Sequence, residues 1–481
     1  MASLLVRSQR VVFADGVRPA EIRVENGKIV SITNLGTSGT SGTSGTPGTP
    51  GTLGTLGTLG TLGTLGTLGT PGTLIDAGSA AVMPGLVDTH VHINDPGRAD
   101  WEGFETATLA ASAGGVTTLI DMPLNSIPAT TTVAGLDAKR LAARGRCHVD
   151  VGFWGGVVPG HARDIEPLAR AGVKGFKCFL SPSGVDEFHH VSEADLAEAM
   201  PIVAATGLPL LVHAEWPPLL RQPDPGADPR RYSTWLDSRP TTAEQAAIDL
   251  VIDLAARTGA RVHIVHLATV DALSSIGGAR AKGIPLTVET CPHYLTFAAE
   301  DIADGDTALK CAPPIRESEH REGLWRALKT GVIDLIATDH SPAPASLKHI
   351  EDGNFLEAWG GIASLQISLP AVWTAAATRA LPLPRFAEWM SAAPARLAGL
   401  DGQKGAIAPG YDADLVIFDP EREMIVDASR LYHRHALTPY DGARLRGVVM
   451  ATMLGGEIVF EHGECIGPPL GRDLTQPRGA R

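Results

Sequence analysis

Eight short apolar segments, separated by alanine-rich stretches, constrain the fold of this chain most strongly. They lie between about residues 80 and 400, and each has the length of a strand that is buried on both faces. The expected strands span residues 81–87, 116–121, 149–158, 173–179, 208–212, 261–265, 286–288 and 333–337. Helices are expected at 103–113, 194–205 and 243–256, where Ala, Leu and Glu dominate. This alternation predicts an α/β fold of the (β/α)8 TIM-like barrel type.

The two ends of the chain have a different pattern. Residues 20–32 alternate apolar and polar side chains around Asn26-Gly27, which is typical of a β-hairpin, and the runs 413–418 and 448–460 are similar. A chain of 481 residues exceeds the usual size of one domain. We therefore expect a small β-sandwich domain built from residues 1–80 and 401–481, beside a barrel that spans residues 81–400.

Residues 36–74 are a low-complexity tract of Gly-Thr-X triplets, in which X is Ser, then Pro, then mostly Leu. The tract has too little proline for a collagen helix. Its glycine content and its small, regularly spaced apolar side chains make a packed core unfavourable. We expect a flexible insertion in the small β domain, with no function of its own.

Composition limits the kind of partner. The formal net charge of −13 argues against a nucleic-acid or anionic-membrane surface. No apolar run approaches the roughly 20 residues that cross a bilayer, and the first residues do not form a secretory signal. Five scattered cysteines suit a reducing compartment. These features predict a soluble cytoplasmic protein with a small-molecule partner, no nucleic acid and no membrane.

Six side chains that can bind metal fall at the carboxyl ends of the expected strands, where such barrels place their chemistry. They are His90 and His92 after the first strand, Lys177 near the end of the fourth, His213 and His266 at the ends of the fifth and sixth, and Asp339 at the end of the eighth. Two positions apart on an extended backbone, His90 and His92 point to the same side and can hold one metal. A single His after a strand is more often an ordinary hydrogen-bonded residue, but six coinciding placements predict a two-metal hydrolytic site.

Lys177 lies in the apolar run 173–180, where an ammonium group is costly unless it is paired or neutralised. A neutral amine can add carbon dioxide and become a carbamate, whose two oxygens can bridge two metals. We therefore expect Lys177 to be N6-carboxylysine. His263 is out of phase with His266 and is expected to face the helical layer, while His340 has at most a role in orienting substrate or product.

Several motifs resemble those of the cyclic amidohydrolases in the binuclear-metal amidohydrolase superfamily, and most closely those of the allantoinase branch. They occupy residues 84–92, 101–106, 121–125, 175–179, 289–294, 310–316, 338–342 and 357–362. The resemblance covers nearly the whole chain apart from the Gly-Thr-X tract. It implies hydrolysis of the cyclic amide of allantoin to allantoate in purine catabolism, by a homotetramer.

Sibling branches of the family test this resemblance. Dihydroorotases carry an arginine two residues after the His-x-His motif to bind the substrate carboxylate, but this chain has Asn94 there. Hydantoinases and dihydropyrimidinases usually have a tyrosine in the loop after the modified lysine, and residues 181–184 contain none. Both departures favour allantoin. A hydantoinase or dihydropyrimidinase is the alternative; a non-catalytic structural relative is a remote one, because it predicts missing ligands and all six are present.

The resemblance also implies the roles of the site residues. One metal takes His90, His92 and Asp339, and the other takes His213 and His266, while the Lys177 carbamate and a hydroxide bridge both. Nitrogen and oxygen ligands suit two zinc ions and leave cobalt, manganese and iron open. The hydroxide attacks a ring carbonyl, and the carboxylate of the first metal's aspartate accepts its proton and passes it to the leaving nitrogen.

Three further residues are candidates for binding the substrate. Asn94 and Asn125 are polar residues near strand ends, and the backbone of Ala312 in an Ala-Pro-Pro segment can offer hydrogen bonds. An ordinary turn residue is an equally good interpretation of each.

Overall fold

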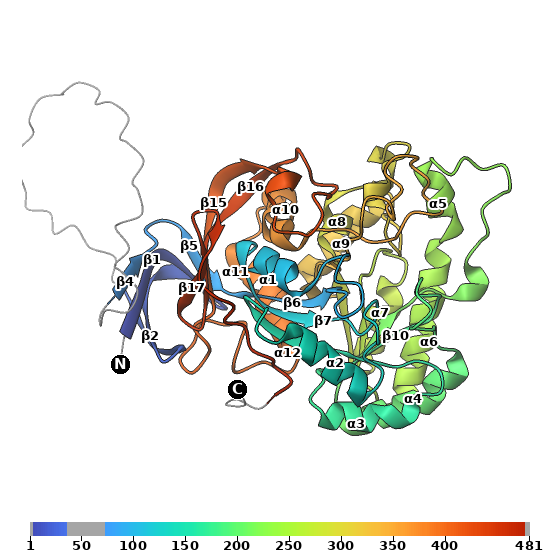
Figure 1. Ribbon diagram of the computed structural model, residues 1–481, viewed down its shortest axis with the longest axis horizontal. Helices are drawn as coiled ribbons and strands as arrows, with labels where there is room; N and C mark the ends of the chain where they lie inside the picture. Colours follow the sequence, from blue (N-terminus) through green and yellow to red (C-terminus); the bar gives the residue numbers. More distant parts are fainter. Residues whose placement is uncertain (1–2, 36–72, 477–481) are drawn as a thin grey trace, which may run out of the picture.

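The computed structural model describes residues 3–35 and 73–476. Except for Thr73 and Leu74, the expected flexible insertion lies outside these residues. Figure 1 shows a helix-covered barrel beside a smaller β-sheet that contains both the first and the last strands of the chain.

Within the described residues, eight parallel strands build the barrel. They are β6 (Leu86–Val91), β7 (Val116–Asp121), β8 (Asp150–Phe153), β10 (Phe176–Phe179), β11 (Leu210–His213), β12 (Val262–Ile264), β13 (Leu286–Thr290) and β14 (Leu335–Ile336). The strands hydrogen-bond in the order β6-β7-β8 and β9-β10-β11-β12-β13-β14, where β9 (Gly155–Gly156) follows β8. A parallel bridge between Val91 and His340 joins the last segment to the first. The predicted (β/α)8 barrel is confirmed.

The first predicted strand, residues 81–87, was wrong in one respect: it is two strands in two sheets. β5 (Ala81–Pro84) pairs with strands of the small sheet, and the barrel strand β6 begins at Leu86. Gly85 joins them at a point where the chain passes so close to β7 that an added Cβ would lie 2.4 Å from Oγ1 of Thr117. A continuous apolar run hides this change of sheet, because both strands are buried.

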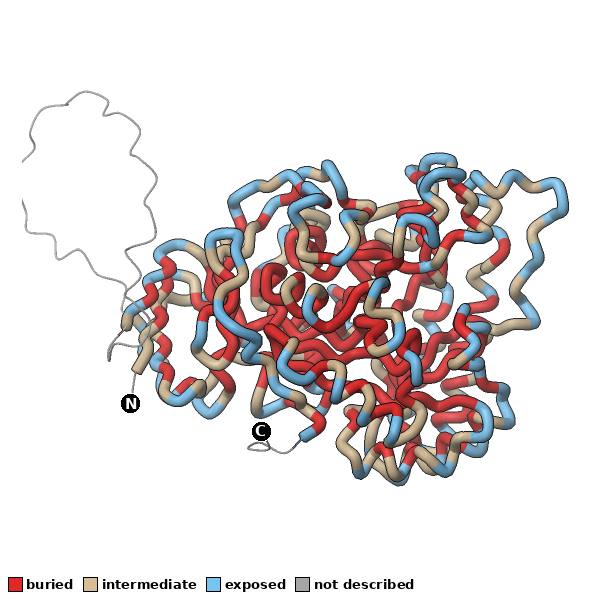
Figure 2. The backbone as a smooth tube through the Cα atoms, in the orientation of Figure 1, coloured by how far each residue is buried: buried red, intermediate tan, exposed pale blue. Residues whose placement is uncertain are grey.

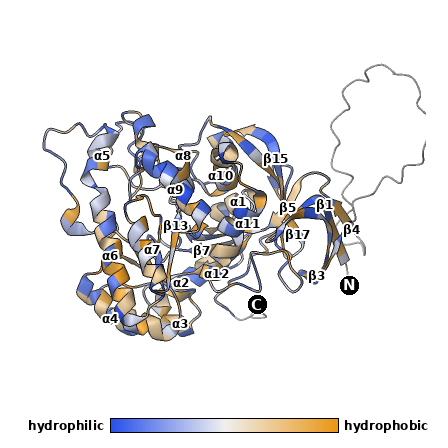
Figure 3. Cartoon of the chain, turned by 180° about the vertical axis from the view of Figure 1, so that it is seen from behind, coloured by the Kyte–Doolittle hydropathy of each residue, from blue (hydrophilic) through white to orange (hydrophobic). Residues whose placement is uncertain are grey.

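Twelve α-helices occur in the part of the chain that the structure describes, and most of them cover the barrel. They are α1 (Phe104–Ala113), α2 (Val133–Ala143), α3 (Ile165–Arg170), α4 (Glu193–Thr206), α5 (Tyr232–Ser238), α6 (Thr241–Thr258), α7 (Leu273–Ala281), α8 (Pro292–Thr296), α9 (Ser318–Thr330), α10 (Ser368–Ala376), α11 (Leu383–Ala387) and α12 (Ala393–Leu397). The three predicted helices match α1, α4 and α6. Helix α4 begins at a capping box between Ser192 and Asp195 and ends at Gly207, which is left-handed. Helix α9 buries Leu324 and Leu328 and is largely hydrophilic elsewhere (Figure 3).

The small sheet joins the two ends of the chain, as predicted. Its strands besides β5 are β1 (Ser3–Phe13), β2 (Gly16–Glu25), β3 (Lys28–Asn34), β4 (Thr73–Asp76), β15 (Leu415–Ile425), β16 (Arg444–Leu454), β17 (Glu457–Glu461) and β18 (Glu464–Cys465). Asn26 and Gly27 form the predicted hairpin turn with φ of 51° and 75°. An added Cβ on Gly456, between β16 and β17, would lie 3.0 Å from Cγ1 of Val24, so distant strands of this one sheet face each other.

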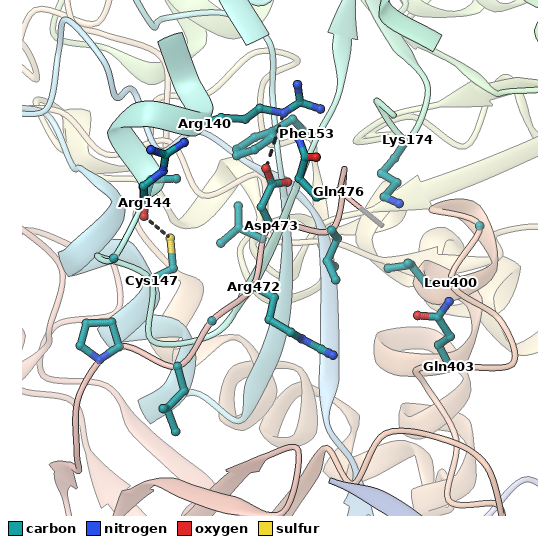
Figure 4. Close-up of a pocket in the computed structure, with 18 residues that line it drawn as sticks. Arg140, Arg144, Cys147, Phe153, Lys174, Leu400, Gln403, Arg472, Asp473 and Gln476 are labelled. Carbon is teal, nitrogen blue, oxygen red and sulfur yellow. Dashed lines mark hydrogen bonds and ion pairs between the residues drawn. The ribbon is translucent and has the colours of Figure 1, made fainter. Parts of the chain in front are cut away.

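The carboxyl-terminal tail returns from the small sheet to the barrel. Asp473 forms a parallel bridge with Val151 of β8, and the backbone N–H of Leu474 donates to the carbonyl oxygen of Val151 at 2.8 Å. The tail thus lies along an edge of β8, at the amino ends of the barrel strands. Figure 4 shows it beside Phe153 and Lys174, where it lines a cavity of about 1310 Å³.

Burial follows this architecture. Figure 2 shows buried residues along the barrel strands and exposed ones on the outer helices and loops. All five cysteines are free. Among residues 3–35 and 73–476, no helix has the length and apolar character needed to cross a membrane.

Candidate functional site

The six predicted ligand residues are buried at the carboxyl ends of the barrel strands. Lys177 is 0% exposed, and Asp339, which has the largest exposed fraction of the six, is 8% exposed. Five of them line one pocket of about 70 Å³, together with Asn125 and Ala312: His90, His92, His213, His266 and Asp339. The structure therefore brings together residues from strands that lie far apart in the sequence.

The ligand atoms form two neighbouring clusters. In the first, Nε2 of His90 and Nε2 of His92 lie 3.1 and 3.3 Å from Oδ1 of Asp339. In the second, Nδ1 of His213 lies 2.9 Å from Nε2 of His266. The clusters adjoin, because the rings of His90 and His266 have centroids 5.4 Å apart. Nitrogen and carboxylate donors that converge in this way suit divalent cations.

Lys177 supplies the test of whether two metals fit. Its Nζ is buried and has no hydrogen-bond partner among the described residues, and it lies 4.5 Å from the ring centroid of Phe179. Burial lowers the pKa of Lys177 to about 8, although the carboxylate of Asp339 opposes this shift. A buried amine without a partner is unfavourable. A carbamate on this nitrogen would supply two oxygens to the adjoining clusters, so the residues present fit a pair of metals.

Burial and neighbouring side chains keep three other predicted ligands in the protonation state that can bind a metal. Burial lowers the pKa of His92 to about 4 and that of His266 well below its usual value, so both rings are neutral at pH 7 and can donate a lone pair. Burial alone would raise the pKa of Asp339, but His90, His266 and His92 hold it far below its usual range. Asp339 is therefore ionised at neutral pH.

Several site residues have left-handed backbone conformations. His266 and Asp339 have φ of 41° and 48°, a conformation that is uncommon outside glycine, although His and Asp adopt it more often than most other residues. Asn94 and Asn125 both have φ of 65°, which asparagine tolerates. Asn125 also lines the pocket, with its Nδ2 3.4 Å from Nδ1 of His92, whereas Asn94 is buried outside the pocket lining.

A buried carboxylate that the sequence did not reveal lies behind His90. Nδ1 of His90 and Nε2 of His263 lie 2.5 and 2.9 Å from the two carboxylate oxygens of Glu289. Burial would raise the pKa of Glu289, but His90 and His263 lower it to about 2. Because the carboxylate accepts from Nδ1–H of His90, Nε2 is left free for a metal.

The expectation that His263 faces the helical layer is wrong. Its side chain is 0% exposed and contacts Glu289 within the barrel. The expectation extended the two-residue alternation of a strand from His263 to His266. Strand β12 ends at Ile264, and the left-handed turn at His266 breaks that alternation.

A second buried carboxylate supports the other cluster. Nε2 of His213 lies 2.7 Å from Oε2 of Glu215, which also accepts a hydrogen bond from Nη1 of Arg239. Burial would raise the pKa of Glu215, but Arg239 and His213 lower it to about 2. The spacing of His213 and Glu215, two residues apart after a strand, could have indicated this pair, but nothing in the sequence indicated Arg239.

His340 turns away from the pocket. Its Nδ1 accepts a hydrogen bond from the backbone N–H of Ser364 at 3.2 Å, and its Nε2 lies 3.4 Å from Oε2 of Glu102. It does not line the pocket. The contacts in the structure therefore give His340 a place in loop packing rather than beside the ligand atoms.

Comparison with known proteins agrees with this geometry. The family model described as the amidohydrolase family matches residues 81–459. The chain belongs to the amidohydrolase family. This amidohydrolase is 47% identical to an allantoinase of Streptomyces avermitilis over 99% of its own length and 97% of that protein's. It is 46% identical to an allantoinase of Saccharomyces cerevisiae, with 84% of this chain and 88% of the yeast protein covered.

Solved structures give the same result for the fold. The L-hydantoinase (dihydropyrimidinase) of Arthrobacter aurescens superimposes on this amidohydrolase with a TM-score of 0.88 at 31% sequence identity, over 98% of this chain and 99% of that one. The resemblance inferred from the motifs is confirmed, and the amidohydrolase is a hydrolase of cyclic amides.

Proposed function

We propose that this amidohydrolase is an allantoinase, which opens the hydantoin ring of allantoin to give allantoate in purine breakdown. One observation supports this most directly: a chain that is 47% identical to an allantoinase over almost its full length places two predicted ligand clusters beside buried Lys177, whose Nζ has no hydrogen-bond partner in the described ranges. The pocket between them is small and suits a compact substrate.

The ligand assignment follows the two clusters. We assign one metal to His90, His92 and Asp339, a second to His213 and His266, and the bridging position to Lys177 as N6-carboxylysine formed with CO2. Zinc is the proposed metal, with cobalt, manganese and iron as alternatives for this donor set. Two such cations would polarise the ring carbonyl and lower the pKa of a water molecule.

Asp339 is the proposed proton carrier. It is ionised at neutral pH, lines the pocket and has the largest exposed fraction of the six ligands. Its carboxylate takes the proton of the attacking water and delivers it to the ring nitrogen that leaves. The imidazoles around it stabilise the carboxylate and keep it oriented.

The proposed substrate contacts are Asn94, Asn125 and Ala312. Asn125 and Ala312 line the pocket, and Oδ1 of Asn125 is buried without a partner in the described part of the chain, so it can accept from a ring N–H. Both amide atoms of Asn94 are likewise unpartnered there. A buried polar atom without a partner is unfavourable until a ligand or water pairs with it.

A substrate panel tests the proposal. Purified, metal-replete protein is assayed with allantoin, hydantoin, dihydrouracil and dihydroorotate, and allantoin is expected to give the highest kcat/KM. If allantoin is the poorest of the four, the substrate assignment is wrong. The second candidate, a hydantoinase or dihydropyrimidinase, is favoured by the close structural match to the Arthrobacter enzyme and predicts that hydantoin or dihydrouracil is best. A non-catalytic relative predicts no turnover, and the presence of all six ligands argues against it.

The quaternary state and compartment are also proposals. We propose a cytoplasmic homotetramer, on the strength of the family resemblance and of a composition without a membrane segment. Sedimentation of the purified protein checks the first and cell fractionation checks the second. A monomeric species of full activity would contradict the tetramer.

A further inference from the structure

One wall of the site pocket is held by two buried lysines. Lys310 and Lys348 are 4% and 2% exposed, and neither makes an ion pair with a described residue. Nζ of Lys310 donates to the carbonyl oxygens of Leu356 and Ala358 at 3.1 and 2.5 Å. The amine of Lys310 is therefore paired with backbone carbonyls of residues 356–358, directly before Trp359 and Gly360, which line the pocket.

Lys348 and Lys310 together hold the backbone of residues 356–361, and we call this pair of lysines the clamp. Nζ of Lys348 donates to the carbonyl oxygens of Lys310, Trp359 and Gly361 at 3.1, 3.0 and 2.8 Å. The backbone N–H of Trp359 also donates to the carbonyl oxygen of Leu347 at 2.7 Å. Burial lowers the pKa of Lys348 to about 7, but three carbonyl acceptors match the three donors of its ammonium form and favour that form. The backbone of Trp359 is thus held on both sides.

The side chain of Trp359 has an unused donor. Its ring lines the same pocket as the ligand residues and packs edge-on against Trp101, with centroids 4.8 Å apart. Its Nε1 is buried and has no hydrogen-bond partner among residues 3–35 and 73–476. A buried N–H without a partner is unfavourable. Because the ring is held in place, a hydrogen-bond acceptor on a bound ligand would relieve this cost.

We propose that the indole N–H of Trp359 is a specificity-determining donor that binds the carbonyl oxygen of the substrate's ureido arm. The inference rests on the proposed function. The ring amide of the substrate must lie at the ligand clusters, and the rest of the hydantoin ring is assigned to Asn94, Asn125 and Ala312. The ureido arm is then the part of allantoin left for Trp359. Hydantoin and dihydrouracil lack this arm and its acceptor. A site built around a donor rejects an analogue that leaves the donor unpaired.

The test compares Trp359→Phe with the matched control Trp101→Phe. The first substitution removes the donor and keeps an aromatic ring, and the second changes the ring against which Trp359 packs. We expect kcat/KM of Trp359→Phe for allantoin to fall about 10- to 100-fold, mainly through KM, with less than about a threefold change for hydantoin. Trp101→Phe is expected to change both by less than about threefold, and metal content stays at the parent value in both variants.

The outcomes separate the two proposals. If Trp359→Phe lowers kcat/KM equally for allantoin and hydantoin, or does not lower it for allantoin, the role of Trp359 is overturned while the proposed function stands. If the unaltered protein does not hydrolyse allantoin, both the proposed function and the role of Trp359 are refuted.

Two further measurements keep the inference testable if Trp359→Phe does not fold. The unaltered protein must prefer allantoin to hydantoin by about tenfold or more in kcat/KM, and a ratio near one overturns the inference. Lys348 is a positioning residue, because it acts only through the backbone around Trp359. Lys348→Met removes its three hydrogen bonds to that backbone and is expected to raise KM for allantoin more than for hydantoin at nearly constant kcat. An equal rise for both substrates contradicts the role of the clamp.

Discussion

Replacing Glu289 by glutamine tests whether the carboxylate behind His90 sets the strength of metal binding. Glutamine keeps the shape but loses the charge and one acceptor, so the two nitrogens that now face the carboxylate, from His90 and His263, can no longer both donate. Glu289 is 0% exposed, and solvent does not screen the change.

The magnitude follows from the bond that is lost. A hydrogen bond to a charged group contributes about 1.5–3 kcal/mol, which corresponds to a factor of about 10 to 150 in an equilibrium constant. Partners behind metal-bound histidines typically change metal affinity by about 10- to 100-fold. We therefore expect Glu289→Gln to bind zinc about 10- to 100-fold more weakly than the parent.

Zinc affinity is measured on metal-free protein by competition with a chromophoric chelator, and circular dichroism confirms that the variant is folded. Glu244→Gln is the matched control, because Glu244 is also buried, at 2% exposed, and its carboxylate accepts from the backbone N–H of Ala268 and from Nη2 of Arg316, neither of which is a predicted ligand. The control is expected to bind zinc within about threefold of the parent. Parent-like affinity in Glu289→Gln would refute the reasoning.

Four other outcomes are expected. Lys177→Ala should lose most bound metal and activity, because it removes the proposed bridging group, and acetate or propionate should restore part of both; unchanged metal content by elemental analysis counts against the bridge. Since the pKa of Lys177 is about 8, reconstitution of metal-free protein with zinc and bicarbonate should speed up about tenfold per pH unit from pH 6 to 7.5 and level off above about 8, and a flat profile contradicts this. Gly471→Ala places a Cβ 1.9 Å from the carbonyl oxygen of Val149 and should destabilise the protein by about 1–3 kcal/mol in thermal or urea unfolding, so an unchanged melting curve would argue against tight packing of the tail. Deletion of residues 36–72, motivated by their Gly-Thr-X composition, should leave kcat and KM within about twofold, and a collapse of activity would show that the tract has a role.

The barrel and its ligand positions were predictable because parallel strands share one functional edge. Once His90, His213 and Asp339 were placed at the carboxyl ends of the first, fifth and eighth strands, the fold predicted that they would lie close together. The structure confirms that they line one pocket. Lys177 was recognisable from its apolar neighbours alone, because an ammonium group in a buried strand is costly unless it is paired or neutralised.

What the sequence did not reveal depends on contacts between distant segments. Glu289 contacts His90 across 199 positions, and Arg239 reaches Glu215 from a loop with no motif that marks it. The clamp of Lys348 is formed with carbonyl oxygens, which every residue has, so no side-chain pattern announces it. The break between β5 and β6 was hidden for another reason: both strands are fully buried and read as one apolar run.

The tail that lies against β8 also bears on how this protein is made. Arg472 hydrogen-bonds to Asp150 across 322 positions, so β8 leaves the ribosome long before its partner is synthesised. Until residues 472–474 have been synthesised, that edge of the nascent barrel has unpaired backbone groups of the kind that pair with other strands. A chain that stops just after β18 would therefore contain all six predicted metal ligands but leave this edge of β8 unpaired and able to pair with strands of other molecules.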